Sequence, residues 1–152
     1  MICPAVFRSD SGSTLVGSAA RDTIDVNEVY LYVPSKLLIT VDKALSHEVL
    51  GPIYEEHGYF FKGTPDRDYL VLLLFMIYEH QKGPASFWHP YFTAIEPDDL
   101  PCHWDDAVIE LIEDRELREQ IYEMREDVES DWDIMKKLMR VYPETFDLSK
   151  CT

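Results

Sequence analysis

The chain has 152 residues and a formal net charge of −15. This length allows one domain with a substantial hydrophobic core, and the acidic balance disfavours binding to the phosphate backbone of a nucleic acid. The longest apolar run has about ten residues, about half of what a bilayer-spanning helix needs, so neither a nucleic acid nor a membrane is an expected partner.

The N-terminal region predicts a small antiparallel sheet. Residues 1–13 end in a polar loop. Three short segments that follow favour strands by their apolar, β-branched and aromatic content: Leu15–Ala20, Glu28–Val33 and Leu37–Thr40. Pro34 ends the second strand, because proline cannot donate a ladder hydrogen bond.

A change of period at Thr40 predicts the first helix. Thr40 is expected to cap a helix that runs through Val41 and Val49 and ends near Gly51-Pro52. Residues Ile53–Lys62 are aromatic and are expected to be irregular.

The most apolar stretch is Tyr69–Tyr78, within the longer segment Asp66–Lys82. Acidic residues lie near the start of this segment and Lys82 lies near its end, which is the distribution of charge that a helix dipole favours. Gly83-Pro84 is a helix stop signal just after it. A helix that is apolar on every face is buried on most sides. We therefore expect this segment to be the core helix.

The C-terminal part predicts further helices. Pro84–Pro101 is broken by prolines and is expected to form a short turn against the core, followed by a helix over Trp104–Glu113 and a long helix over Arg115–Val141. The apolar stripe of the Trp104–Glu113 helix is Trp104, Val108, Leu111 and Ile112, and that of the long helix is Leu117, Ile121, Met124, Val128, Trp132, Met135, Leu138 and Met139.

Together these elements predict an α+β fold. A small β-region over residues 1–40 is followed by a helical region over residues 41–152, and the two are expected to pack as one domain.

The cysteines favour an intracellular protein with reduced thiols, cytoplasmic or nuclear. Cys3, Cys102 and Cys151 are odd in number and far apart. The chain begins without a secretory signal pattern. A zinc site at Cys102-His103 lacks the paired ligand spacing of known sites, so no metal ligand is predicted.

Five phrases, taken in order, carry a resemblance to a known family: Ala20–Asp22, Glu28–Val33, Pro34–Thr40, Val49–Tyr54 and Ser86–Tyr91 (SFWHPY). This order resembles the SET-domain protein methyltransferases, in the branch that contains the Rubisco large-subunit methyltransferase and the actin-histidine methyltransferase. In that branch a V-P-x-x-L-L-x-T phrase precedes a helical insertion that carries S-F-W-x-P-Y. The resemblance covers about Leu15 to Leu148, which corresponds to the N-terminal half of the SET domain plus its helical insertion.

The resemblance implies S-adenosylmethionine as cofactor and a lysine or histidine of a protein as methyl acceptor. It implies cofactor contacts from the loop before the first strand, which an ungapped match places at Ser13, Thr14 and Leu15. The acid and the glycines of the family's loop are not at these positions; a gapped match places Ser11-Gly12-Ser13 there instead. The family's Asn-His pair and catalytic tyrosine have no counterpart here, so no catalytic residue is predicted.

Two functions follow from these patterns. One is a methyltransferase chain that lacks the C-terminal catalytic half and is inactive alone, with a protein substrate and a complementing chain as partners. The alternative is a non-catalytic protein-binding module, or a structural subunit of a larger assembly, derived from a SET domain. A hydrolase is disfavoured, because no G-x-S-x-G, H-E-x-x-H or P-loop motif occurs.

Phe87, Trp88 and Tyr91 are assigned to packing, with lining of a substrate groove as the alternative.

Overall fold

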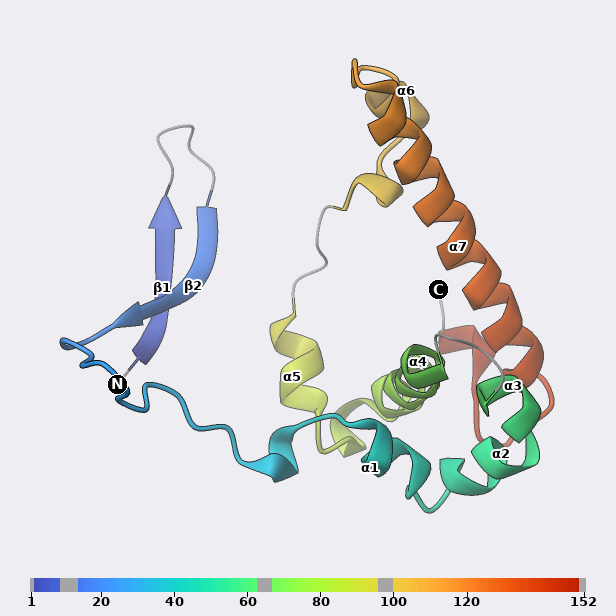
Figure 1. The fold of residues 1–152 in the computed structure, drawn as a ribbon. Helices are drawn as coiled ribbons and strands as arrows, with labels where there is room; N and C mark the ends of the chain where they lie inside the picture. Colours follow the sequence, from blue (N-terminus) through green and yellow to red (C-terminus); the bar gives the residue numbers. More distant parts are fainter. Residues whose placement is uncertain (1, 9–13, 63–66, 96–99, 151–152) are drawn as a thin grey trace. The chain divides into compact units, whose positions relative to one another are not determined.

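A computed structural model confirms the predicted α+β class and describes residues 2–8, 14–62, 67–95 and 100–150 (Figure 1). These residues contain one two-stranded sheet and seven α-helices. The chain divides into two compact units, Met1–Leu38 and Ile39–Thr152. None of the described helices is both long enough and apolar enough to cross a membrane.

The N-terminal unit is an antiparallel hairpin of β1 (Ile2–Arg8) and β2 (Thr14–Ala20), in the register Ile2↔Ala20 to Arg8↔Thr14. β2 confirms the first predicted strand, whereas β1 was not predicted. A Cβ at Gly17 would lie 3.1 Å from the Phe7 ring, so glycine allows this ring to approach the opposite strand.

The predicted strands Glu28–Val33 and Leu37–Thr40 are wrong. Residues 28–34 have no regular structure, and Ser35–Leu37 forms a 3₁₀ turn. Val29 and Tyr32 are 77% and 80% exposed. Strand propensity expresses packing against a neighbouring strand, and within the described residues no strand pairs with this segment.

The helical unit begins as predicted at Thr40, whose side chain accepts a hydrogen bond from the Lys43 amide at 3.4 Å. The helix it caps, α1 (Val41–Leu45), is shorter than expected. Gly51-Pro52 does not end a helix; it lies in the first turn of α2 (Leu50–Glu56), where proline's missing N–H costs no intrahelical bond.

The segment expected to be irregular, Ile53–Lys62, is helical: it forms the rest of α2 and all of α3 (Gly58–Lys62). Two of its aromatic side chains enter the core. Tyr54 and Phe61 are buried, and their rings meet edge to face at 4.9 Å. Tertiary packing of these rings stabilises helices that are too short to form alone.

The predicted core helix is confirmed as α4 (Arg67–Gln81). Its buried residues are Leu70, Val71, Leu74, Phe75 and Glu79. The segment after α7 folds back on it: the Gln81 amide group exchanges two hydrogen bonds with the backbone of Asp147, and Phe146 is buried beside Tyr78.

After α4 come a 3₁₀ turn (Gly83–Ala85), α5 (His89–Ala94) and a second 3₁₀ turn, η3 (Pro101–His103). The predicted helix over Trp104–Glu113 is reduced to α6 (Asp106–Ile109). Trp104 ends the preceding turn, and the buried residue is Ile109, not Val108 or Leu111. The chain ends its described part in a 3₁₀ turn, Leu148–Lys150.

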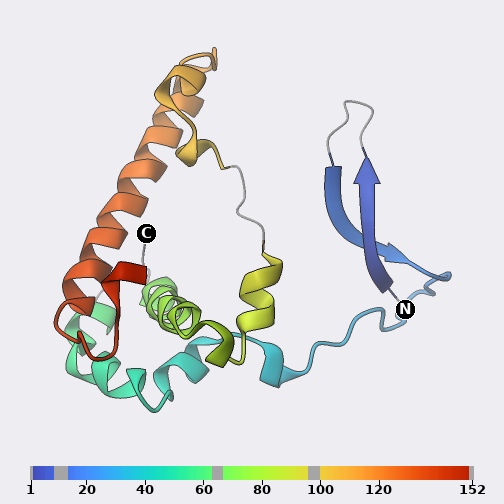
Figure 2. The same ribbon diagram turned by 180° about the vertical axis from the view of Figure 1, so that it is seen from behind.

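The long helix is confirmed as α7 (Arg115–Met139), capped by the Asp114 carboxylate, which accepts from the Leu117 amide at 3.1 Å. Its apolar stripe divides in two. Met135, Leu138 and Met139 are buried in the core, whereas Leu117, Met124 and Val128 are about half exposed. Figures 1 and 2 agree that the C-terminal end of α7 lies beside α3 and that its N-terminal end lies beside α6.

Candidate functional site

Two of the three predicted cofactor-contacting residues, Thr14 and Leu15, lie at the start of β2. Ser13 lies outside the described residues. Thr14 is exposed and pairs with Arg8, and Leu15 pairs with Phe7. Thr14 and Leu15 are therefore strand residues rather than loop residues. Cofactor contact at these positions stays a prediction.

The most unusual polar group is the carboxylate of Glu79, which is 1% exposed near the end of α4. Lys82 Nζ donates to Oε1 at 2.8 Å, and Ser86 Oγ donates to Oε2 at 2.6 Å. His47 Nε2 lies 3.7 Å from Oε1. A buried carboxylate needs such partners to remain in the core. We call these four residues the Glu79 cluster.

His47 joins the Glu79 cluster to α2. Its Nδ1 accepts hydrogen bonds from the Val49 and Leu50 amides at 3.2 and 3.3 Å. Nδ1 is therefore unprotonated, and the ring proton lies on Nε2, which faces Glu79. Burial lowers the pKa of His47, and the nearby Glu79 carboxylate opposes this in part.

The Glu79 cluster shapes the SFWHPY phrase. The Ser86 hydroxyl that donates to Glu79 also accepts from the Trp88 amide at 3.1 Å. The Trp88 ring meets Phe75 of α4 edge to face at 5.3 Å, so Trp88 packs on the core as assigned. Phe87 and Tyr91 are 57% and 48% exposed, and each ring packs in part against a neighbouring ring, Phe87 against Trp88 and Tyr91 against Phe92.

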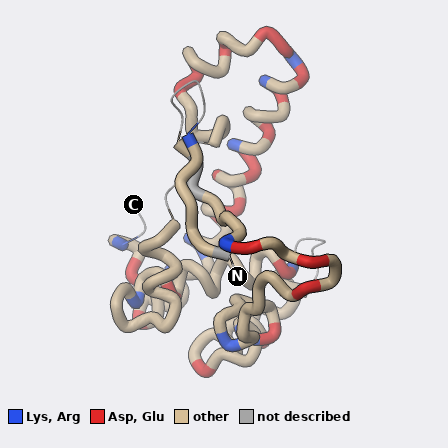
Figure 3. The backbone as a smooth tube through the Cα atoms, turned by 90° about the vertical axis from the view of Figure 1, so that its left-hand side faces the viewer, with Lys and Arg blue, Asp and Glu red and all other residues tan. Residues whose placement is uncertain are grey.

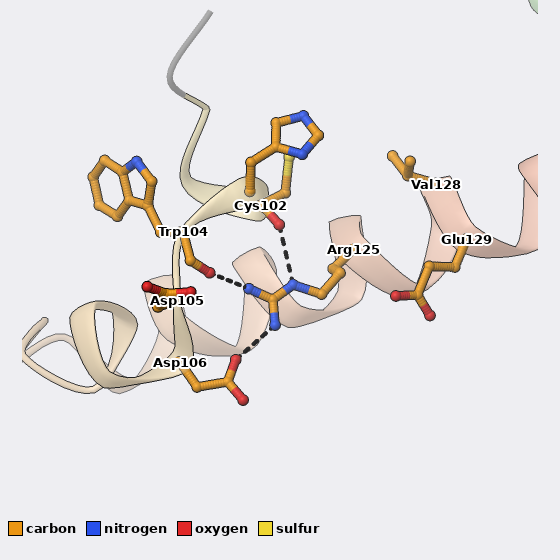
Figure 4. A pocket seen from close by; sticks show the side chains of 8 residues that line it. Cys102, Trp104, Asp105, Asp106, Arg125, Val128 and Glu129 are labelled. Atoms are coloured by element: carbon orange, nitrogen blue, oxygen red, sulfur yellow. Dashed lines mark hydrogen bonds and ion pairs between the residues drawn. The ribbon is translucent and has the colours of Figure 1, made fainter. Parts of the chain in front are cut away.

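A pocket of about 400 Å³ lies where η3 and α6 meet α7 (Figure 4). Arg125 forms its centre. Its Nε donates to the Cys102 carbonyl at 3.0 Å, and its two terminal nitrogens donate to the Trp104 carbonyl and the Asp106 carboxylate, each at 2.6 Å. The hydrogen bond to Asp106 raises the pKa of Arg125. This guanidinium joins η3 and α6 to α7, and each of its three nitrogens already donates a hydrogen bond. We call it the Arg125 clamp.

Metal ligation finds no support in the part of the chain that the structure describes: no three His, Cys, Asp or Glu side chains there could hold an ion together. Cys3 and Cys102 are free thiols, and Cys151 lies outside the described residues.

Sequence reasoning missed the Glu79 cluster and the Arg125 clamp. Glu79 carried a usable signal, since it is the one acidic residue in the apolar stretch from Tyr69 to Gln81. The Arg125 clamp carried none, because its acceptors lie 19 to 23 residues away along the chain.

Comparison with known proteins finds similarity to actin-histidine N-methyltransferases. The mouse and human proteins are each 25% identical to this chain over 126 residues, which is 82% of the chain and 20% of the relative. The chain thus spans about a fifth of the length of the curated relatives it matches. No family model matches the chain, and no solved structure matches it significantly. The similarity supports a relationship to methyltransferases.

Proposed function

We propose that these residues are part of a SET-family protein N-methyltransferase that uses S-adenosylmethionine and acts on a lysine or histidine of an intracellular protein, cytoplasmic or nuclear. In this proposal residues 1–40 are the N-terminal β-region of the SET domain and residues 41–152 its helical insertion, the two packed as one domain. The carrying observation is the 126-residue similarity to actin-histidine N-methyltransferases.

The Glu79 cluster adds support, because it explains the serine and the tryptophan of the SFWHPY phrase. Ser86 is the residue whose hydroxyl reaches the buried carboxylate, and Trp88 is the ring that packs on α4. The phrase that carries the resemblance is thus built into the helical unit and is not a chance run on a surface loop.

We further propose that these residues do not transfer a methyl group by themselves. The reaction needs an unprotonated acceptor nitrogen held in line with the sulfonium methyl group of the cofactor. Thr14 and Leu15 are paired in the β1–β2 ladder and do not form the loop from which the resemblance expects the cofactor contacts. The sequence contains no Asn-His pair. A further segment or a complementing chain would supply the cofactor site.

A chimera tests the family proposal. The matched 126-residue segment of the human relative is replaced by that of this chain, and S-adenosylmethionine binding and actin methylation are measured. Retention of both cofactor binding and actin methylation supports the proposal; a folded chimera that has neither contradicts it. Calorimetry on the 152-residue chain tests the second part, for which we expect no saturable binding of S-adenosylmethionine and no methyl transfer. Transfer by the chain alone would contradict that expectation.

The second candidate is a non-catalytic binding module or structural subunit. The exposed stripe residues Leu117, Met124 and Val128 of α7 favour it, because apolar surface of this kind often lies at protein contacts. Failure of the chimera, together with a stable complex of the chain with a cellular protein, would favour this candidate over the first.

A further inference from the structure

One face of α7 forms a groove with α3 and α4, outside the Glu79 cluster and the Arg125 pocket. Two cavities, of about 450 and 360 Å³, share Phe60 of α3 and Ile134 of α7 as lining residues. Their α7 residues follow helical spacing along one face, from Asp127 and Asp131 through Ile134 to Leu138, and Val141 lies just beyond the end of the helix. We call this continuous surface the α7 groove.

One end of the α7 groove is acidic and aromatic. Asp127 and Asp131 lie one helical turn apart, opposite Tyr69 of α4. Neither carboxylate forms an ion pair with a described residue. Tyr69 is half exposed, and burial followed by the charge of Asp131 raises its pKa. Two carboxylates beside a half-exposed phenol ring can bind a cation, because the carboxylates attract its charge and the ring face adds a cation–π interaction.

The other end is apolar. Tyr59 and Val141 line it and are 81% and 61% exposed, beside the buried Leu138. Lys137 lies at this end, so the α7 groove carries negative charge at one end and a positive charge at the other. Acidic residues recur along the rest of α7 (Figure 3), and the whole chain has a net charge of −15. A second copy of the chain would therefore be repelled.

We propose that the α7 groove binds a basic segment of another protein, in which an arginine or lysine lies about 10 Å from a large apolar side chain. This spacing follows because Leu138 lies seven positions after Asp131, at about 1.5 Å per helical residue. It corresponds to about three residues of an extended peptide. Lys137 sets the direction, because the reverse orientation would place the cation of the partner against it. This binding is separate from the proposed methyl transfer.

The test uses the full chain, ¹⁵N-labelled, and a short Gly/Ser peptide that carries an arginine and, about three residues further on, a tryptophan. We expect saturable NMR shifts that are confined to α3, the start of α4 and residues 127–141. A peptide with glutamate in place of the arginine should not bind, and this control uses the unaltered protein. A peptide with the arginine next to the tryptophan should bind more weakly, because one end of the groove is then left empty.

Matched charge variants separate the α7 groove from general attraction. Asp127→Asn with Asp131→Asn should weaken binding about threefold to tenfold. Glu123→Gln with Glu126→Gln removes the same charge from α7 outside the groove and should change binding less than about twofold. The proposal is overturned if no saturable shift occurs at millimolar peptide, or if the glutamate peptide binds as well as the arginine peptide. It is also overturned if both double variants weaken binding equally. Shifts at the α7 groove that depend on protein concentration and not on peptide would show that a second copy of the chain binds there, which would overturn it too.

Discussion

Ser86 and Glu79 form a 2.6 Å hydrogen bond in the core, seven residues apart in the sequence and on opposite sides of the turn that ends α4. The bond ties the start of the SFWHPY phrase to the core helix. Lys82, between them in sequence, supplies the compensating charge at 2.8 Å. A buried carboxylate thus determines how the chain leaves α4.

Removing the buried carboxylate should destabilise the protein. Glu79→Ala leaves Ser86 and Lys82 without their acceptor, and we expect a loss of about 2 kcal/mol in the free energy of unfolding. Urea unfolding measures it. Glu126→Ala, on the exposed surface of α7, should stay within about 0.5 kcal/mol. Equal effects of the two changes would show that the Glu79 cluster adds nothing to stability.

Stability should fall as pH decreases through the range below the ordinary His47 pKa of 6.5. The folded state lowers the pKa of His47, so the unfolded chain binds more protons between the two pKa values. The stabilisation is therefore present above pH 6.5 and is lost as pH falls toward the folded-state pKa. Protonation of Nδ1 would also remove the cap on the Val49 and Leu50 amides.

The measurement is the free energy of unfolding of wild type and of His47→Asn at a series of pH values from neutral to mildly acidic. Asparagine is a strong capping residue without a titrating ring. The difference in stability between the two proteins should shrink as pH falls. A constant difference would contradict the proposed role of His47.

Trp88 and Phe87 should respond differently to truncation. Trp88→Ala removes a ring that packs on Phe75, and we expect a loss of about 2 kcal/mol, below the range for fully buried rings because Trp88 is half buried. Phe87→Ala should cost less than about 1 kcal/mol, since Phe87 is 57% exposed. Thermal or urea unfolding compares them. A larger loss at Phe87 would show that this ring, and not Trp88, holds the phrase.

Replacing Arg125 should release η3 and α6 without unfolding the core. Lysine keeps the charge but cannot reach the Cys102 and Trp104 carbonyls and the Asp106 carboxylate at once. In Arg125→Lys we expect faster amide hydrogen exchange in residues 101–110 and unchanged exchange in α4. Arg115→Lys, at an exposed ion pair with Glu119, is the matched control. Unchanged exchange in residues 101–110 of Arg125→Lys would show that the clamp is not required.

The sequence by itself determined the features that depend on neighbouring residues. The apolar run and its flanking charges predicted α4, the spacing of the stripe predicted α7, and Thr40 was identified as a cap. The order of the short phrases pointed to methyltransferases, a relationship that the 126-residue similarity supports. The signals for α4, α7 and the Thr40 cap are local ones, because periodicity and capping operate between residues a few positions apart.

Only the tertiary structure decided which segments find partners. Val29 and Tyr32 have strand-forming side chains but no described strand beside them, while Tyr54 and Phe61 are helical because their rings pack in the core. In the same way, a residue of the α7 stripe is buried or exposed according to whether another part of the core packs against it. Strand pairing, burial and ion pairing join residues that are distant in sequence, and local propensity carries no information about such distant contacts.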